Sequence, residues 1–198
     1  WSSVYSLFFQ LLGAYLLILS LKYNSRSYLM FSGIATSLTF WCRQPVGVFM
    51  FLAIIVFFLC LYFLRQISFK ELNKNILIFI FGNFIVCLSF LIWLFLNNAI
   101  KDWWLQSIVN AFLFANSLSG ESLFSTLYRN LLPASKSPIS VWTLLPLSTF
   151  LLTMKFSIKI FGKSEEREKQ INILAICFIS LASWLQYHPV PDIRHLYW

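Results

Sequence analysis

Six long apolar runs constrain the fold of this chain more than any other feature. They cover residues 4–21, 28–42, 46–64, 76–96, 141–161 and 171–187. A helix that crosses about 30 Å of hydrocarbon needs about 20 mostly apolar residues, because every backbone polar group must be satisfied within it. The runs reach or approach that length, although 28–42 is too short to cross alone if it stands upright. We therefore predict an all-α integral membrane protein, a single multispanning domain over residues 1–198 with about six transmembrane helices.

Composition supports lipid as the solvent for much of the surface. The 198 residues are 59% hydrophobic and 11% charged, whereas soluble domains are roughly 45–50% apolar and about 25% charged. The net charge of +8 could suggest a nucleic-acid ligand, but the basic residues separate apolar runs and do not form one hydrated face. We expect membrane lipids as partners and no nucleic acid. Because the chain opens at Trp1 without Met, we also expect an internal segment of a longer membrane protein.

The distribution of Lys and Arg predicts the orientation of the spans. Ten of these residues lie in or beside the connections after the first, third and fifth runs, whereas five lie on the opposite side. Cytoplasmic loops are enriched in Lys and Arg. We therefore predict that the Arg43 region, the loop over residues 97–140 and the chain after residue 187 are extracytoplasmic.

The second and third runs meet at Arg43-Gln44-Pro45 and predict a helical hairpin with a tight polar tip. Proline lacks an N–H donor and disfavours α geometry in the preceding residue, so we expect Gln44 to leave the α region. Arg43 lies on the side that is poor in basic residues. It is either an anchor for lipid headgroups or, with Gln44, a ligand of a lipid phosphate.

Two further outer segments are candidates. Asp102-Trp103-Trp104 opens a stretch to Asn116 whose apolar spacing predicts an extracytoplasmic interfacial helix, with the Trp pair at headgroup depth. The last residues present Asp192, Arg194 and His195 after two prolines. This cluster either binds a phosphate or sugar or is an interfacial loop held by its aromatic residues.

Polar residues within the runs have structural interpretations. Gln10 predicts an interhelical hydrogen bond, and Ser32-Gly33 with Thr36-Ser37 predicts close helix packing.

Catalytic and metal signals are weak. The four cysteines have no CxxC spacing and no neighbouring His, so we expect small buried hydrophobic residues and no metal site. No Ser or Cys has the setting of an activated nucleophile, and no pair of carboxylates has a spacing for acid–base catalysis. The catalytic residues are unknown from this sequence.

Three segments resemble the C class of membrane glycosyltransferases, which use polyprenyl-phosphate sugars and include protein O-mannosyltransferases and the lipid A aminoarabinose transferase. In Gly33–Phe49 a small-residue helix ends in Arg43, Gln44, Pro45 and a Gly; Asn97–Gln106 is a polar turn before an aromatic outer helix; and Pro191–Leu196 is an Asp/Arg/His-Leu patch. The resemblance implies sugar transfer from a polyprenyl-phosphate carrier to an acceptor on the extracytoplasmic face, in the bacterial cytoplasmic membrane. It also implies a catalytic carboxylate upstream of this sequence and a divalent metal in the full-length protein, with no cofactor in this segment. The alternatives are a transporter or flippase segment, which would more typically carry buried charges at mid-bilayer, and a non-catalytic membrane scaffold.

Overall fold

The computed structural model describes residues 2–110, 113, 148–158 and 167–185, and every regular element in this part of the chain is a helix. Four long helices come first: α1 (Ser2–Tyr23), α2 (Arg26–Cys42), α3 (Gln44–Phe63) and α4 (Phe69–Leu96). The short α5 (Ile100–Trp104) continues into the π-helical turn η1 (Leu105–Val109). Residues 148–158 are helical, and α9 spans Arg167–Leu185.

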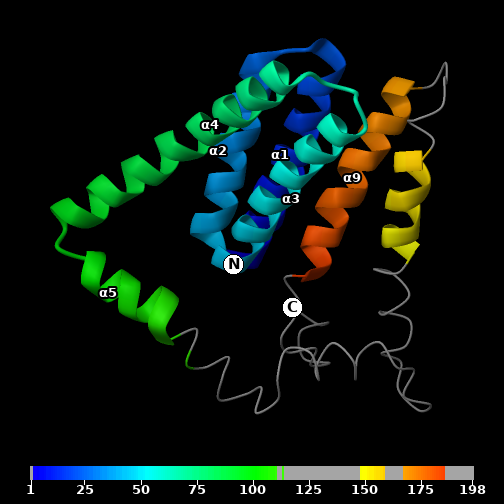
Figure 1. Cartoon of the computed structure of the whole chain (residues 1–198). Helices are drawn as coiled ribbons and strands as arrows, with labels where there is room; N and C mark the ends of the chain where they lie inside the picture. Colours follow the sequence, from blue (N-terminus) through cyan, green and yellow to red (C-terminus); the bar gives the residue numbers. More distant parts are fainter. Residues whose placement is uncertain (1, 111–112, 114–147, 159–166, 186–198) are drawn as a thin grey trace, which may run out of the picture.

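The helices alternate in direction along the chain. The α1–α2 connection, the α3–α4 connection and the start of α9 lie at one end of the bundle, at the top of Figure 1. The α2–α3 junction and the end of α9 lie at the other. The described Lys and Arg residues in or beside the connections after the first, third and fifth apolar runs thus lie at a common end, as the predicted orientation requires. Lys155, on the 148–158 helix, is the exception.

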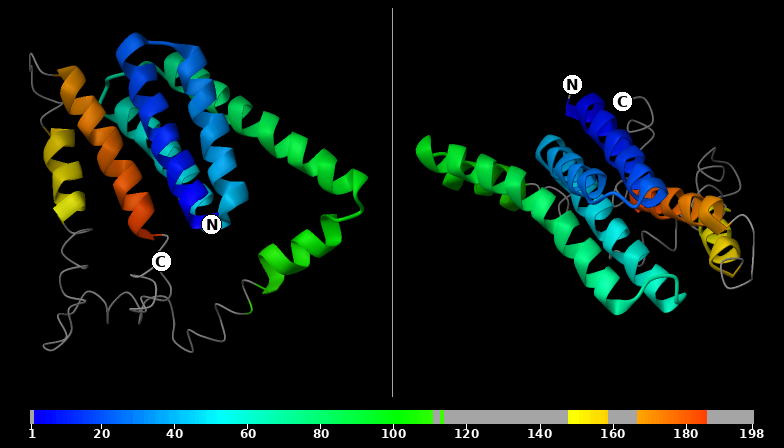
Figure 2. Two further views of the ribbon diagram at one scale, coloured as in Figure 1. Left: turned by 180° about the vertical axis from the view of Figure 1, so that it is seen from behind. Right: turned by 90° about the horizontal axis from the view of Figure 1, so that it is seen from above.

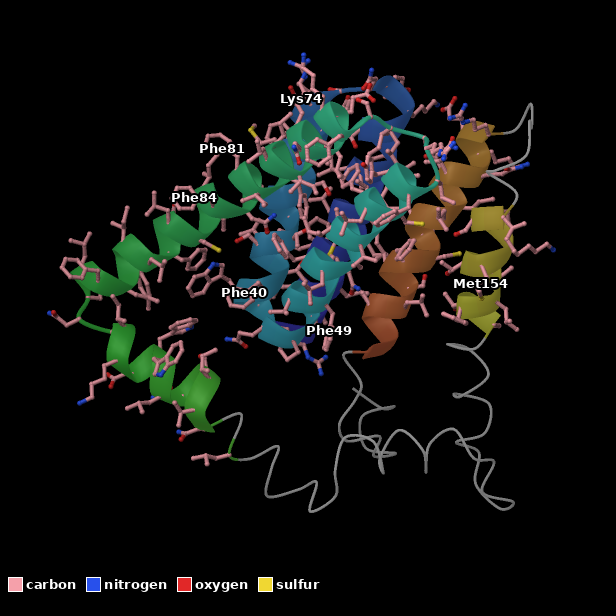
Figure 3. All side chains as sticks on the ribbon, in the orientation of Figure 1. Phe40, Phe49, Lys74, Phe81, Phe84 and Met154 are labelled. Carbon is pink, nitrogen blue, oxygen red and sulfur yellow. The ribbon has the colours of Figure 1, made fainter. Side chains whose placement is uncertain are left out.

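Within the described residues, three helices are long and apolar enough to cross a membrane. They are the first, third and fourth predicted spans: Val4–Tyr23, Gln44–Phe63 and Phe69–Leu96. Their outer surfaces are apolar, as lipid contact requires. Phe81 and Phe84 of α4 are each 55% exposed and point away from the bundle in Figure 3. The described chain is therefore an all-helical integral membrane protein by length and composition. At 17 residues α2 is short, as its sequence predicted.

Small residues bring α2 and α4 into close contact. A Cβ on Gly33 would clash with the carbonyl oxygen of Phe79, and one on Gly82 with that of Met30. On the α1 side, the Ser32 hydroxyl donates a hydrogen bond of 2.8 Å to the carbonyl oxygen of Gly13. These contacts confirm that the small residues of α2 serve packing.

The bundle core is centred on α3, and residues of α1, α2, α4 and α9 pack around it. Phe57, Phe58, Met50 and Leu174 are buried in one cluster. Gln10 of α1 donates to the hydroxyl of Ser183 on α9, which confirms the predicted interhelical hydrogen bond. All four cysteines are free; Cys177 is buried and the other three are half-buried.

The helix α4 leaves the bundle along its second half. Its side chains contact α2 as far as Phe90, while the helix slants outward toward α5, as both views in Figure 2 show. The exposed fraction reaches 59% at Trp93, 69% at Phe95 and 72% at Leu96. Most of the circumference of this half is therefore free of other described protein segments.

Candidate functional site

The α2–α3 junction consists of a single non-helical residue, Arg43. Its backbone is extended, with φ −155° and ψ 100°. The Arg43 N–H donates to the carbonyl oxygen of Thr39 at 2.8 Å, and its own carbonyl accepts from Gly47 N–H at 3.2 Å. Both helices are thus hydrogen-bonded through the residue that separates them, which fixes the position of the Arg43 backbone.

The prediction that Gln44 leaves the α region was wrong by one residue. Gln44 is the first residue of α3, and Arg43 is the extended residue. Pro45 lies in the first turn of α3, where a missing N–H costs nothing because that N–H would have no partner within the helix. The chain therefore resumes the helix directly before the proline and turns at Arg43.

The side chains of Arg43 and Gln44 are half-buried, and neither forms a hydrogen bond to a residue in the described segments. In those segments no carboxylate lies within salt-bridge distance of the Arg43 guanidinium. An arginine at the edge of an apolar bundle needs an anionic or aqueous partner for its five donors. This guanidinium is therefore available to an external anion.

An aromatic cluster joins the hairpin to α4 and α5. Trp41, two residues before Arg43, stacks on Phe90 of α4 with ring centroids 4.6 Å apart and an interplanar angle of 15°. Its ring also lies 5.3 Å from that of Trp103 on α5. Within the described residues the buried Trp41 Nε1 has no hydrogen-bond partner. The structure thus links two predicted site segments, the hairpin tip and the start of the outer helix.

The predicted outer helix is present in its described part, and it begins at Ile100, two residues before Asp102. Asp102 is exposed, Trp104 is 53% exposed and Trp103 is half-buried. No residue of α5 is buried. Their depth in a membrane stays a prediction.

Three predicted site residues lie outside the described part of the chain: Asp192, Arg194 and His195. In the predicted loop over residues 97–140, the structure describes residues 97–110 and Leu113. Among the residues that are described, no three His, Cys, Asp or Glu side chains converge as a metal site would require. The two histidines of the sequence are outside that set.

A polar cavity at the opposite, basic end of the bundle was missed by the sequence analysis. It has a volume of about 610 Å³ and lies between the α1–α2 turn, the α3–α4 connection and the start of α9. Three cationic side chains line it, together with the carboxylates Glu71 and Glu168. The cations are Arg26, Lys74 and Arg167. Figure 3 shows Lys74 at this end of the bundle.

A capping box at the start of α4 borders this cavity through Glu71. The Ser68 hydroxyl accepts from Glu71 N–H at 3.2 Å, and the Glu71 carboxylate accepts from Ser68 N–H at 2.8 Å. The helix α4 therefore begins at Phe69, seven residues before the predicted span at Ile76; the Ser-x-x-Glu spacing was the sequence signal for this start.

The capping box also tunes the titration of Glu71. With 28 residues α4 is about 42 Å long, longer than the hydrocarbon core, which leaves its polar first turns outside. The hydrogen bonds from the Ser68 backbone and side chain lower the pKa of Glu71 below its ordinary value of 4.5, and nearby Lys74 adds a smaller lowering. Glu71 is therefore an ionised partner of Ser68 at neutral pH.

In comparisons with known proteins, no protein family, no curated protein and no solved structure matches this chain.

Proposed function

We propose that this chain is the membrane-embedded part of a C-class glycosyltransferase, which transfers a sugar from a polyprenyl-phosphate carrier to an acceptor on the extracytoplasmic face. The observation that supports this function is the state of Arg43: a half-buried guanidinium at a hairpin tip, with no ionic partner among the described residues and beside the Trp41 cluster. Arg43 and Gln44 hold the phosphate of the lipid carrier in this proposal.

The chemistry of the donor suits such a residue. Departure of a lipid phosphate from the sugar leaves negative charge on the phosphate oxygens. A fixed guanidinium fork binds two of these oxygens and stabilises that charge. A general base elsewhere in the full-length protein would activate the acceptor hydroxyl. Asp192, Arg194 and His195 are proposed to lie on the same side and to contribute to donor binding, and a divalent metal belongs to the full-length protein if one is used.

The proposed membrane arrangement keeps six spans and an interfacial helix. Besides the three helices with sufficient apolar length, α2, α9 and the segment that includes 148–158 are proposed to complete the set. The helix that starts at α5 is proposed to lie in the outer interface, where the Trp41–Trp103 contact places it next to the hairpin tip.

The test is donor binding by Arg43 variants of the full-length protein. Loss of a charge-assisted contact costs about 1.5–3 kcal/mol, so Arg43→Gln should bind undecaprenyl phosphate roughly 10- to 150-fold more weakly. Arg43→Lys should fall between, because an ammonium group offers a point charge without the fork. Lys101→Gln is the matched control, since Lys101 is an exposed cation on α5 at the same end of the bundle.

Lipid binding can be measured by native mass spectrometry, and the thermal stability of each variant can be measured in the same preparations. Normal lipid binding by a folded Arg43→Gln variant would make Arg43 a headgroup anchor and would remove the basis of the proposal. An equal loss in Lys101→Gln would reduce the effect to general surface charge.

A further inference from the structure

A cavity lies at the opposite end of the bundle from Arg43. We infer that the cavity of about 610 Å³ between the α1–α2 turn, the α3–α4 connection and α9 binds a hydroxyl-bearing phosphate, of the glycerophosphate or sugar-phosphate type. This inference does not depend on the glycosyltransferase proposal, because none of its residues belongs to the hairpin tip.

The cavity has the dimensions of a small-molecule site and an apolar floor. Ligand pockets generally measure about 300–1,000 Å³. The floor is formed by Leu29, Phe58 and Leu61, all at least 96% buried in the bundle. An apolar wall lowers the local dielectric, which strengthens the attraction between a bound anion and the charges at the rim.

Three cationic residues from three separate elements line one cavity. Arg26 is the first residue of α2, Lys74 lies on α4 and Arg167 is the first residue of α9. In the described part of the chain none of them lies within salt-bridge distance of a carboxylate. Of the two carboxylates at the cavity, Glu71 is engaged by Ser68. Lys74 interacts electrostatically with Glu71, whereas Arg26 and Arg167 have no ionic partner in the described part of the chain. Convergence of cations of this kind suits the binding of a phosphate.

Two amide oxygens identify the other part of the ligand. Gln66 Oε1 and Asn172 Oδ1 are buried, line the cavity and have no hydrogen-bond partner among the described residues. The amide nitrogen of Gln66 is already bonded to the carbonyl oxygen of Leu64 at 2.7 Å, which holds this side chain in place. A buried acceptor without a donor costs free energy, and the phosphate group of a phosphodiester or of a fully ionised phosphate monoester has only acceptors to offer. The ligand must therefore supply donors as well, and hydroxyl groups fit better than an ammonium group beside three cations.

The two sources of such a ligand are a lipid headgroup and a soluble metabolite. For the lipid, the full chain would be purified from bilayers of phosphatidylcholine mixed with phosphatidylglycerol or with phosphatidylethanolamine, and the retained lipid would be identified by native mass spectrometry. For the metabolite, glycerol 3-phosphate and inorganic phosphate would be titrated into the full chain in phosphatidylcholine nanodiscs.

The variants separate a built site from general positive charge. Arg26→Gln and Arg167→Gln should each weaken binding roughly 10-fold. Lys70→Gln and Arg65→Gln remove the same charge from the same end of the bundle, but neither residue lines the cavity, so both should leave binding unchanged. If the cavity variants alone fail to retain phosphatidylglycerol, the ligand is a lipid headgroup. If the cavity variants alone fail to bind glycerol 3-phosphate, the ligand is a soluble metabolite.

Asn172→Leu provides a test that keeps every charge. It removes an unpaired acceptor, so the variant should remain folded even if the arginine variants do not. It should weaken the binding of glycerol 3-phosphate or phosphatidylglycerol, because their hydroxyl groups would no longer find the Asn172 Oδ1 acceptor. The inference is overturned if no probe binds the unmodified chain. It is also overturned if Lys70→Gln and Arg65→Gln lose as much binding affinity as the cavity variants, or if Asn172→Leu binds every hydroxylated probe normally.

Discussion

Gly33 of α2 lies directly against the carbonyl oxygen of Phe79 on α4, with no room for a Cβ between them. The contact joins two helices that are adjacent in space and separated by the whole of α3 in the chain. It sets how closely α2 and α4 approach, and thus where α4 crosses the bundle.

Replacement of this glycine should therefore destabilise the protein. Gly33→Ala forces backbone displacement, and overpacking of this kind costs about 1–3 kcal/mol. Gly13→Ala is the matched control, because its Cβ would meet the terminal methyl of Met50 at 2.7 Å, a flexible side chain that can move. Thermal unfolding in detergent should show a clear loss for Gly33→Ala and little change for Gly13→Ala. Equal midpoints would contradict the α2–α4 contact.

The orientation of the bundle predicts the labelling of its two ends. Single cysteines would replace Lys70, at the start of α4, and Lys101, on α5 just beyond the end of α4, in a background that lacks the four native cysteines. Both positions are exposed. An impermeant thiol reagent applied from outside should label the cysteine at 101 and spare the one at 70. Labelling of both from outside would refute the predicted topology, and labelling of 70 alone would reverse it.

The outer helix should lie at the depth of the lipid headgroups. Trp104, at 53% exposure, should be quenched most strongly by lipids brominated near the headgroup. Comparison of the unmodified chain with Trp104→Phe isolates this signal from the other tryptophans. Strongest quenching by deep bromines would mean that α5 enters the hydrocarbon.

Acid should remove the contribution of the α4 capping box to stability. Because the pKa of Glu71 is lower in the folded protein than in the unfolded chain, its contribution is complete above the unfolded pKa and is lost as pH falls through the folded pKa. The thermal midpoint of Glu71→Gln should thus lie below that of the unmodified chain at neutral pH, and the difference should shrink below pH 4.5. Lys70→Gln serves as a control for the loss of a charge in the same turn. A difference that does not change with pH would show that the carboxylate is not held by Ser68.

Apolar length and periodicity were sufficient to predict the helical class and three of the spans, because a run of about 20 apolar residues has few alternatives to a buried helix. Gln10 was predictable as a hydrogen-bonding residue, but its partner Ser183 lies 173 positions away, and sequence spacing cannot identify such a partner. The break at Arg43 was displaced by one residue because proline tolerates a helical first turn. The basic cavity was missed because its residues come from connections that, taken singly, have the composition of solvated loops.

The close contact of α2 and α4 at Gly33 and Gly82 fixes the point where the two helices cross. The segment from Gly82 to Leu96 is about 21 Å long, so a tilt of about 5° would displace its end by about 2 Å. Beyond this crossing, the ring of Trp41 fills the space between α2 and α4 and stacks on Phe90. Because the ring of Trp41 also contacts Trp103, one side chain on α2 spaces α4 and positions α5 at the same time.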